Sequence, residues 1–290
     1  MYVYINRAMP LQKDPTTTFG LAQGANILFV VQPRMLTQQI SQDFPLANGE
    51  NTITVSLVSL TDLPRRSRIT ITGLTGSATT SSSSIALTTP TFLVPSATWN
   101  GTAGSLVIET TRGGMPANFL TIFTFVVTNG PLENAESSIW LSGFVESSSG
   151  ATVDARSASF MGPSRMSTDN TAILGILNGS NPLKYLRPYL IKNISQSSAQ
   201  VSSINTLTVT LQLNLQLHSA QGSELTLSGL VHSATLSTAS LPLTYPDGYV
   251  SVFGTTGKWT QSTGTLRLAI SSAGSGALEA RQMYVFSFQV

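Results

Sequence analysis

Apolar and polar residues alternate in short runs along most of this chain. Segments 51–60 and 205–217 alternate small polar residues with Ile, Leu or Val at a period of two, which is typical of half-buried β-strands. The same alternation returns at 68–74, 105–110, 120–127, 224–230, 265–270 and 283–290. Gly, Pro, Ser and Asn separate these runs and favour turns. The pattern predicts an all-β fold of many short strands, as in immunoglobulin-like β-sandwiches.

The β-pattern occurs twice, at an offset of about 155 residues that grows in steps, as loop insertions would make it. The matching positions keep their order: Gly24, Asn26 and Leu28 return as Gly179, Asn181 and Leu183, then Ile40-Ser41-Gln42 as Ile194-Ser195-Gln196, and Trp99 as Trp259. We therefore predict two tandem Ig-like β-sandwich domains over residues 24–177 and 178–290. Residues 1–23 precede them as an extra N-terminal β-strand and a linker.

The two repeats differ in length. The first continues past Phe125 for two more strands, at 138–145 and 151–161, whereas the second ends at Val290. Residues 1–9 hold the place before the first repeat that residues 153–161 hold before the second. An unclosed sandwich exposes an edge that favours pairing with another chain.

We therefore expect strand addition between molecules, in which the N-terminal strand of one molecule completes the C-terminal sandwich of the next. The expected assembly strand contains Met1, Tyr2, Val3, Tyr4, Ile5 and Met9, and the expected acceptor edge contains Tyr284, Phe286 and Phe288. The alternative is that the chain is a piece of a longer array, in which the same strands are joined covalently. Both interpretations predict a head-to-tail string of modules.

The composition limits the classes of function and the location that we expect. Charged residues make up only 10% of the chain and the net charge is +2, while Ser and Thr replace the missing charge. A surface of hydroxyls suits attached sugars or neighbouring subunits, and we expect an extracellular or cell-surface location. The one basic cluster, around Arg65 and Arg66, is too small for a nucleic-acid interface. No apolar run reaches the roughly 18 residues of a membrane span, so we expect no membrane insertion.

Three N-x-S/T sequons predict covalent glycans, at Asn100, Asn178 and Asn193. Asn100 and Asn178 stand beside Gly, which favours them over Asn193. The Ser/Thr-rich stretches 15–19 and 77–84 are candidates for O-glycans, with flexible polar loops as the equal alternative. Trp99 and Trp259 fit a sugar-stacking platform or, as the favoured interpretation, core aromatics.

Several phrases resemble a known repeat. The segments 51–57, 68–79, 253–270 and 283–290 are similar to a repeat of large secreted proteins of unicellular algae and other aquatic microbes. They also resemble subunits of glycan-coated extracellular fibrils from fresh water. The resemblance covers nearly the whole chain. It implies tandem Ig-like sandwiches, heavy glycosylation, linear assembly and no enzymatic activity.

Residues suited to catalysis or metal binding are scattered. The chain has no cysteine, its two histidines are His218 and His232, and its 13 carboxylates are isolated. A zinc site needs more ligands, and a glycosidase needs two facing carboxylates. We therefore expect no enzyme and no cofactor, but a homo-oligomeric structural subunit of an extracellular glycosylated fibril. The alternative is a cell-surface adhesin stalk or a carbohydrate-binding β-sandwich module.

Overall fold

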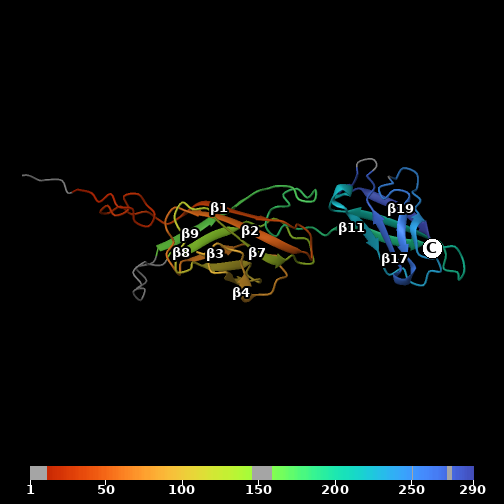
Figure 1. Cartoon of the computed structure of the whole chain (residues 1–290), viewed down its shortest axis with the longest axis horizontal. Helices are drawn as coiled ribbons and strands as arrows, with labels where there is room; N and C mark the ends of the chain where they lie inside the picture. Colours follow the sequence, from red (N-terminus) through yellow and green to blue (C-terminus); the bar gives the residue numbers. More distant parts are fainter. Residues whose placement is uncertain (1–11, 146–158, 250, 273–275) are drawn as a thin grey trace, which may run out of the picture.

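The chain folds into two β-sandwiches that follow one another along the long axis of the molecule (Figure 1). The computed structural model describes residues 12–145, 159–249, 251–272 and 276–290. The expected N-terminal strand, residues 1–9, lies outside these described residues. The prediction of an all-β fold with two tandem Ig-like sandwiches is confirmed.

The first sandwich contains a four-stranded and a six-stranded sheet. The four-stranded sheet has the order β10 (Ser167–Thr168), β1 (Met35–Gln42), β2 (Glu50–Ser59), β7 (Thr121–Thr128). The six-stranded sheet has the order β4 (Ser82–Ala86), β5 (Ser96–Asn100), β6 (Ser105–Glu109), β3 (Arg68–Thr72), β8 (Trp140–Val145), β9 (Ser159–Arg165).

The second sandwich contains a three-stranded and a four-stranded sheet. The three-stranded sheet has the order β11 (Tyr189–Gln196), β12 (Thr206–Leu213), β19 (Met283–Gln289). The four-stranded sheet has the order β14 (Glu224–Leu227), β17 (Thr265–Ala269), β16 (Thr256–Thr260), β15 (Thr238–Pro242). Two short elements, β13 (Leu217–His218) and β18 (Ala277–Leu278), pair beside them, and the 3-10 turns η1 (Ser219–Gln221) and η2 (Gln261–Thr263) complete the fold.

The alternating pattern sets the strand faces in both sandwiches. Ile53, Val55 and Leu57 on β2 point inward and are fully buried, while the Thr and Ser residues between them are half-buried. On the corresponding strand β12, Val209 and Leu211 are buried in the same way. Because inward side chains alternate with outward ones, each sandwich has a hydrophobic core of its own.

Trp99 and Trp259 are core residues of the two sandwiches. Both are buried, and each indole Nε1–H donates to a backbone carbonyl, that of Thr79 at 3.1 Å and that of Thr235 at 3.0 Å. A buried indole needs such an acceptor. The matched bonds support the core interpretation of these two residues, because neither ring is exposed enough to stack on a sugar.

A loop precedes each sandwich, and we call residues 14–31 the first leader loop and residues 169–186 the second leader loop. Both predicted domain boundaries, before residue 24 and after residue 177, fall inside these loops. The second leader loop connects the two sandwiches, and the first one precedes β1. The part of the chain that the structure describes contains no helix long and apolar enough to cross a membrane.

Candidate assembly site

Three strands, β8, β9 and β10, close the side of the first sandwich that lies between β3 and β1. Strand β8 pairs antiparallel with β3 from Arg68↔Phe144 to Thr72↔Trp140, and β9 pairs with β8. The chain then crosses to the other sheet, where β10 pairs in parallel with β1. These strands and the residues beside them add five buried side chains to the core: Ile139, Leu141, Val145, Met161 and Met166.

The second sandwich is open on the corresponding side. Strand order makes β14 the counterpart of β3 and β11 the counterpart of β1, and both are outermost strands of their sheets. Among the described residues, no strand pairs with the free edge of either. Nearly all of β11 is exposed, whereas β1 is buried toward its end. The opening therefore runs between β11 and β14.

The exposed fractions of matched residues show what the closing strands cover. Ile40 on β1 is 0% exposed, but its counterpart Ile194 on β11 is 44% exposed. Leu74, which follows β3, is fully buried, while its counterpart Leu230 is only half-buried. An apolar side chain left in water loses its hydrophobic stabilisation. The opening thus has the apolar lining of a sandwich that accepts further strands.

The expected acceptor residues Tyr284, Phe286 and Phe288 lie elsewhere. They point from β19 into the second core and are buried. Strand β19 pairs with β12 and meets Thr244 at its other edge, just as its counterpart β7 meets Thr88 in the closed first sandwich. Because β19 and β7 have the same neighbours, the open side of the second sandwich lies at β11 and β14 and not at β19.

The expected assembly strand, Met1, Tyr2, Val3, Tyr4, Ile5 and Met9, lies outside the described residues. Gln12 and Lys13 are described, and both are exposed. They precede Asp14 as the β10 residues Ser167 and Thr168 precede Asp169. By this correspondence in sequence, Gln12 and Lys13 match β10.

Gln42, at the end of β1, holds the second leader loop against the first sandwich. Its side-chain Nε2 donates to the carbonyls of Gly179 at 2.8 Å and Lys184 at 2.6 Å, and its Oε1 accepts from the Leu183 N–H at 2.7 Å. The buried Asn51 donates to the same Oε1 at 2.8 Å. Buried amides with every group paired fix one geometry, so this network orients the loop on the first sandwich.

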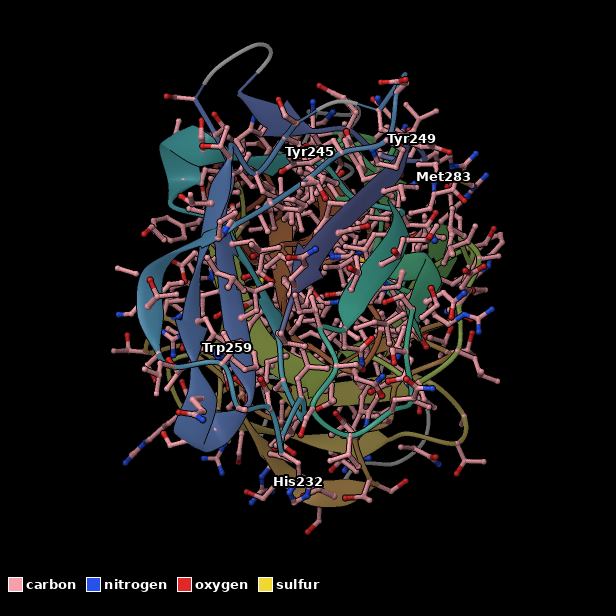
Figure 2. All side chains as sticks on the ribbon, turned by 90° about the vertical axis from the view of Figure 1, so that its right-hand side faces the viewer. His232, Tyr245, Tyr249, Trp259 and Met283 are labelled. Atoms are coloured by element: carbon pink, nitrogen blue, oxygen red, sulfur yellow. The ribbon has the colours of Figure 1, made fainter. Side chains whose placement is uncertain are left out.

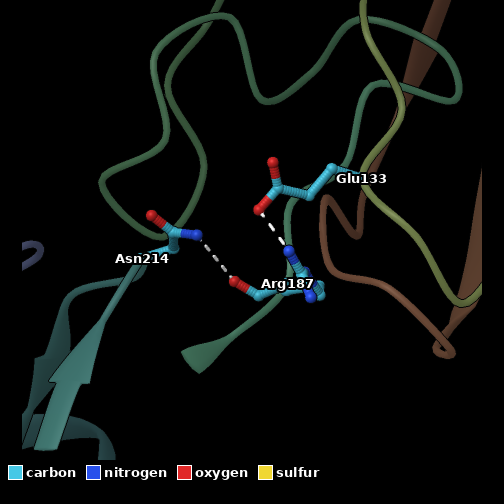
Figure 3. A network of polar contacts seen from close by, with 3 residues as sticks. All are labelled: Glu133, Arg187 and Asn214. Atoms are coloured by element: carbon cyan, nitrogen blue, oxygen red, sulfur yellow. Dashed lines mark hydrogen bonds and ion pairs between the residues drawn. The ribbon is translucent and has the colours of Figure 1, made fainter. Parts of the chain in front are cut away.

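A second polar network joins the two sandwiches (Figure 3). The Arg187 Nε lies 3.7 Å from the Glu133 Oε1 of the first sandwich, and Asn214 at the end of β12 donates to the Arg187 carbonyl at 2.9 Å. The ion pair is half exposed and contributes little by itself. Its geometry nevertheless links both sandwiches through one residue of the connecting segment.

Sequence reasoning did not single out Gln42 or Ile194 for assembly. The signal was present, because Ile40-Ser41-Gln42 returns unchanged as Ile194-Ser195-Gln196. A repeated Ile-x-Gln at the end of a strand indicates a junction only once the strand order and the burial of each copy are known. Matched positions with different exposure then identify the unoccupied surface.

The structure places the three predicted glycosylation residues differently. Asn100 ends β5 on an exposed turn, where its Oδ1 accepts from the Ala103 N–H at 3.0 Å. Asn193 is exposed on β11. Asn178 is only half-buried, but the hydroxyl residue of its sequon, Ser180, is buried and accepts from the Thr171 N–H. The exposed sequons are therefore those of Asn100 and Asn193.

Catalytic and metal-binding groups are not gathered in the described part of the chain, where no three His, Cys, Asp or Glu residues are close enough to hold a metal ion. His218 lies on β13, and His232 lies at the margin of the second sandwich, apart from Tyr245, Tyr249 and Trp259 in the view along the long axis (Figure 2). Glu133 is engaged by Arg187.

Comparisons with known proteins identify no family. No family model matches the chain. No curated protein matches it either. One solved structure, described as "BspA_C_mut", covers 91% of this chain and 90% of its own chain at 10% sequence identity, with a TM-score of 0.37. The fold class therefore stands on the strands and sheets of this structure itself.

Proposed function

We propose that this chain is a structural subunit of an extracellular glycosylated fibril, which assembles head to tail by strand addition. The observation that carries the proposal is the opening between β11 and β14, where Ile194 is exposed although the matched Ile40 is fully buried. A long open strand edge beside apolar side chains is a hazard that proteins usually cover. A strand from another molecule covers it in this proposal.

The occupant of the opening is the N-terminal segment of a neighbouring molecule. Its described end, Gln12 and Lys13, corresponds to Ser167 and Thr168, which pair in parallel with Gln39 and Ile40. By that correspondence, Gln12 and Lys13 lie beside Asn193 and Ile194 of the neighbour. By the same correspondence, the segment takes the β11 side of the opening.

A contact of this kind propagates. The donor segment and the acceptor opening are different surfaces of the same chain, so each molecule can donate to one neighbour and accept from another. Figure 1 places the first leader loop and the C-terminus at opposite ends of the elongated molecule. Such a heterologous contact generates a filament when its rotation does not close a ring.

The surface chemistry supports glycan attachment in the same assembly. Asn193 is exposed on β11, and its counterpart Gln39 stays exposed on β1 although β10 pairs beside it. A side chain at this position points away from the core, so a sugar on Asn193 is compatible with a strand at the edge. Three serines of the edge strand β4 are also exposed, which suits O-glycans.

The alternative function, an adhesin stalk or a carbohydrate-binding module, has one observation in its favour. Trp140 is 43% exposed on the outer face of β8, with Phe144 half exposed on the same face. Exposed aromatic rings are surfaces on which sugars stack. Replacing Trp140 by Ala separates the functions, since only the alternative expects this change to abolish glycan binding.

Deletion of residues 1–9 tests strand addition. The proposal expects the shortened chain to keep both sandwiches folded, by circular dichroism, and to form no filaments. A synthetic peptide of residues 1–13 should bind the shortened chain and should cap growing filaments of the full chain. Continued polymerisation of the shortened chain would refute strand addition, while the fibril function itself would then require another contact.

A further inference from the structure

The two leader loops have the same backbone structure. Leu21 and Thr18 exchange backbone hydrogen bonds as Ile176 and Ile173 do. The left-handed positions also match: Phe19, Gln23 and Leu28 have φ of 52°, 61° and 61°, and Leu174, Asn178 and Leu183 have φ of 53°, 55° and 54°. Non-glycine residues rarely adopt this conformation, so three matched positions indicate one specific loop design used twice.

Each leader loop also meets the sandwich that follows it in the same way. The Asp62 N–H donates to the Phe19 carbonyl at 2.9 Å, and the matched Gln216 N–H donates to the Leu174 carbonyl at 2.9 Å. Each leader loop is therefore hydrogen-bonded in the same way to the sandwich that follows it. The two loops differ in their surroundings, because a sandwich precedes only the second leader loop in this chain.

The second leader loop is covered by the preceding sandwich, and the first is bare. Leu183 is 1% exposed and Tyr185 is 2% exposed, because both pack into the first sandwich. Their counterparts Leu28 and Val30 are 91% and 87% exposed. Asn26, Ile27 and Leu28 also line a surface hollow. In the second leader loop, the carbonyls of Gly179 and Lys184 at the matching place receive the amide of Gln42.

The far end of the second sandwich repeats the surface on which the second leader loop docks. Gln196 and Asn205 are the counterparts of Gln42 and Asn51, and the Asn205 Nδ2 donates to the Gln196 Oε1 at 3.1 Å, as Asn51 donates to Gln42. The loop between them repeats the one after β1, since Ser202 has φ of 63° and Asn48 has φ of 62°.

This far surface is unoccupied too. Gln196 is exposed, although Gln42 is buried. Val201 is 95% exposed, whereas its counterpart Ala47 is 9% exposed and donates its N–H to the Leu186 carbonyl at 2.9 Å. Asn205 exchanges backbone hydrogen bonds with Val290, which places this surface beside the C-terminus, at the end of the molecule opposite the first leader loop (Figure 1).

We infer that the first leader loop of one molecule docks on the Gln196–Asn205 surface of a neighbouring molecule and copies the junction between the two sandwiches. Gln196 donates to the carbonyls of Gly24 and Phe29 and accepts from the Leu28 N–H, and the Val201 N–H donates to the Val31 carbonyl. Leu28, Val30 and Val201 lose their exposure together. The inference rests on the proposed head-to-tail assembly and assigns its interface.

The chain has no cysteine, which allows a site-specific cross-link. Leu46 and Leu186 form a parallel β-bridge inside the molecule, and their counterparts across the proposed interface are Gln200 and Val31. Bridged residues lie about 4.8 Å apart between Cα atoms, within the range that a disulfide spans. The double variant Val31→Cys with Gln200→Cys should therefore give a ladder of disulfide-linked oligomers under oxidising, assembling conditions.

The controls separate this interface from the proposed function. Leu46→Cys with Leu186→Cys should oxidise within one molecule, and either Val31→Cys or Gln200→Cys alone should give no species beyond a dimer. Filaments without a ladder would overturn the interface and leave the fibril function standing. Monomers without a ladder would overturn both. A ladder that survives deletion of residues 1–9 would support the interface and refute strand addition.

A second measurement tests Gln196 directly. Replacing Gln196 by Ala should raise the critical concentration for assembly roughly tenfold or more, because three hydrogen bonds are lost at the interface. Replacing the exposed Gln221 of the same sandwich by Ala is the matched control and should leave the critical concentration unchanged. Equal assembly of the two variants would contradict the role of Gln196.

Discussion

At the scale of residues, the molecule contains its own controls, because most functional positions occur twice in different surroundings. Trp99 and Trp259 have the same burial and the same bond to a backbone carbonyl. Ile40 and Ile194, or Leu183 and Leu28, have the same sequence context and opposite exposure. Pairs with equal exposure have a role in the fold of each sandwich. Pairs with different exposure identify the surfaces that the proposed assembly would cover.

The matched tryptophans should contribute equally to stability. Trp99→Phe and Trp259→Phe each remove an indole donor and leave a partly buried carbonyl without it and a small void, so each should lower the unfolding free energy of its sandwich by about 2–3 kcal/mol. Urea unfolding followed by circular dichroism measures this. The exposed Trp140→Phe should change it by less than about 0.5 kcal/mol. A large effect at Trp140 or none at Trp259 would contradict the paired assignment.

Alkaline pH should destabilise the second sandwich. Burial raises the pKa of Tyr245 to about 12, and burial also raises the pKa of Tyr284. The unfolded chain loses these protons near pH 10 and the folded chain keeps them, so the unfolding free energy should fall as pH rises from about 10 to 12. Thermal unfolding measures this, and Tyr245→Phe should flatten the decline. An unchanged slope in that variant would remove Tyr245 from the explanation.

At the scale of elements, the closing strands explain the difference between the two sandwiches. Strand β8 pairs with the edge of β3 and β10 pairs with the edge of β1, where Ile40 is fully buried. The edges of β14 and β11 have no such cover in the described structure. The same leader loop design stands before both sandwiches, but the first leader loop has no sandwich packed against Leu28.

Matched substitutions on β1 and β11 test this difference. Ile40→Ala should lower the unfolding free energy of the first sandwich by about 2–5 kcal/mol, because it leaves a cavity in a packed core. Ile194→Ala should change the stability of the isolated molecule by less than about 1 kcal/mol and should weaken assembly. Urea unfolding at low concentration and sedimentation at high concentration separate the two effects. Equal destabilisation by both substitutions would mean that the β11 edge is already covered.

The sequence predicts the elements well because strand alternation and the repeat are local signals. The runs around Ile53 and Val209 become β2 and β12, and Gly24, Asn26 and Leu28 mark one leader loop by matching Gly179, Asn181 and Leu183. Alternation does not reveal strand order, so the sequence alone does not show that β19 has neighbours on both sides. The leader loop conformation also escaped prediction, since Phe19 and Leu174 are unusual residues at positive φ.

At the scale of the whole molecule, an unoccupied surface lies at each end. One end presents the bare first leader loop, and the other presents the Gln196–Asn205 surface. Each surface has an occupied counterpart inside the first sandwich or at the junction. In the proposed assembly, the chain extends by adding copies of itself, and each added molecule repeats the internal junction.

Electron microscopy of the purified chain, residues 1–290, tests this assembly most directly. We predict unbranched filaments in which successive sandwiches follow one another at the spacing of the internal junction, so that contacts within and between molecules look alike. Two results would contradict this assembly. One is dispersed monomers even at high protein concentration, and the other is closed dimers in which both ends are buried against each other.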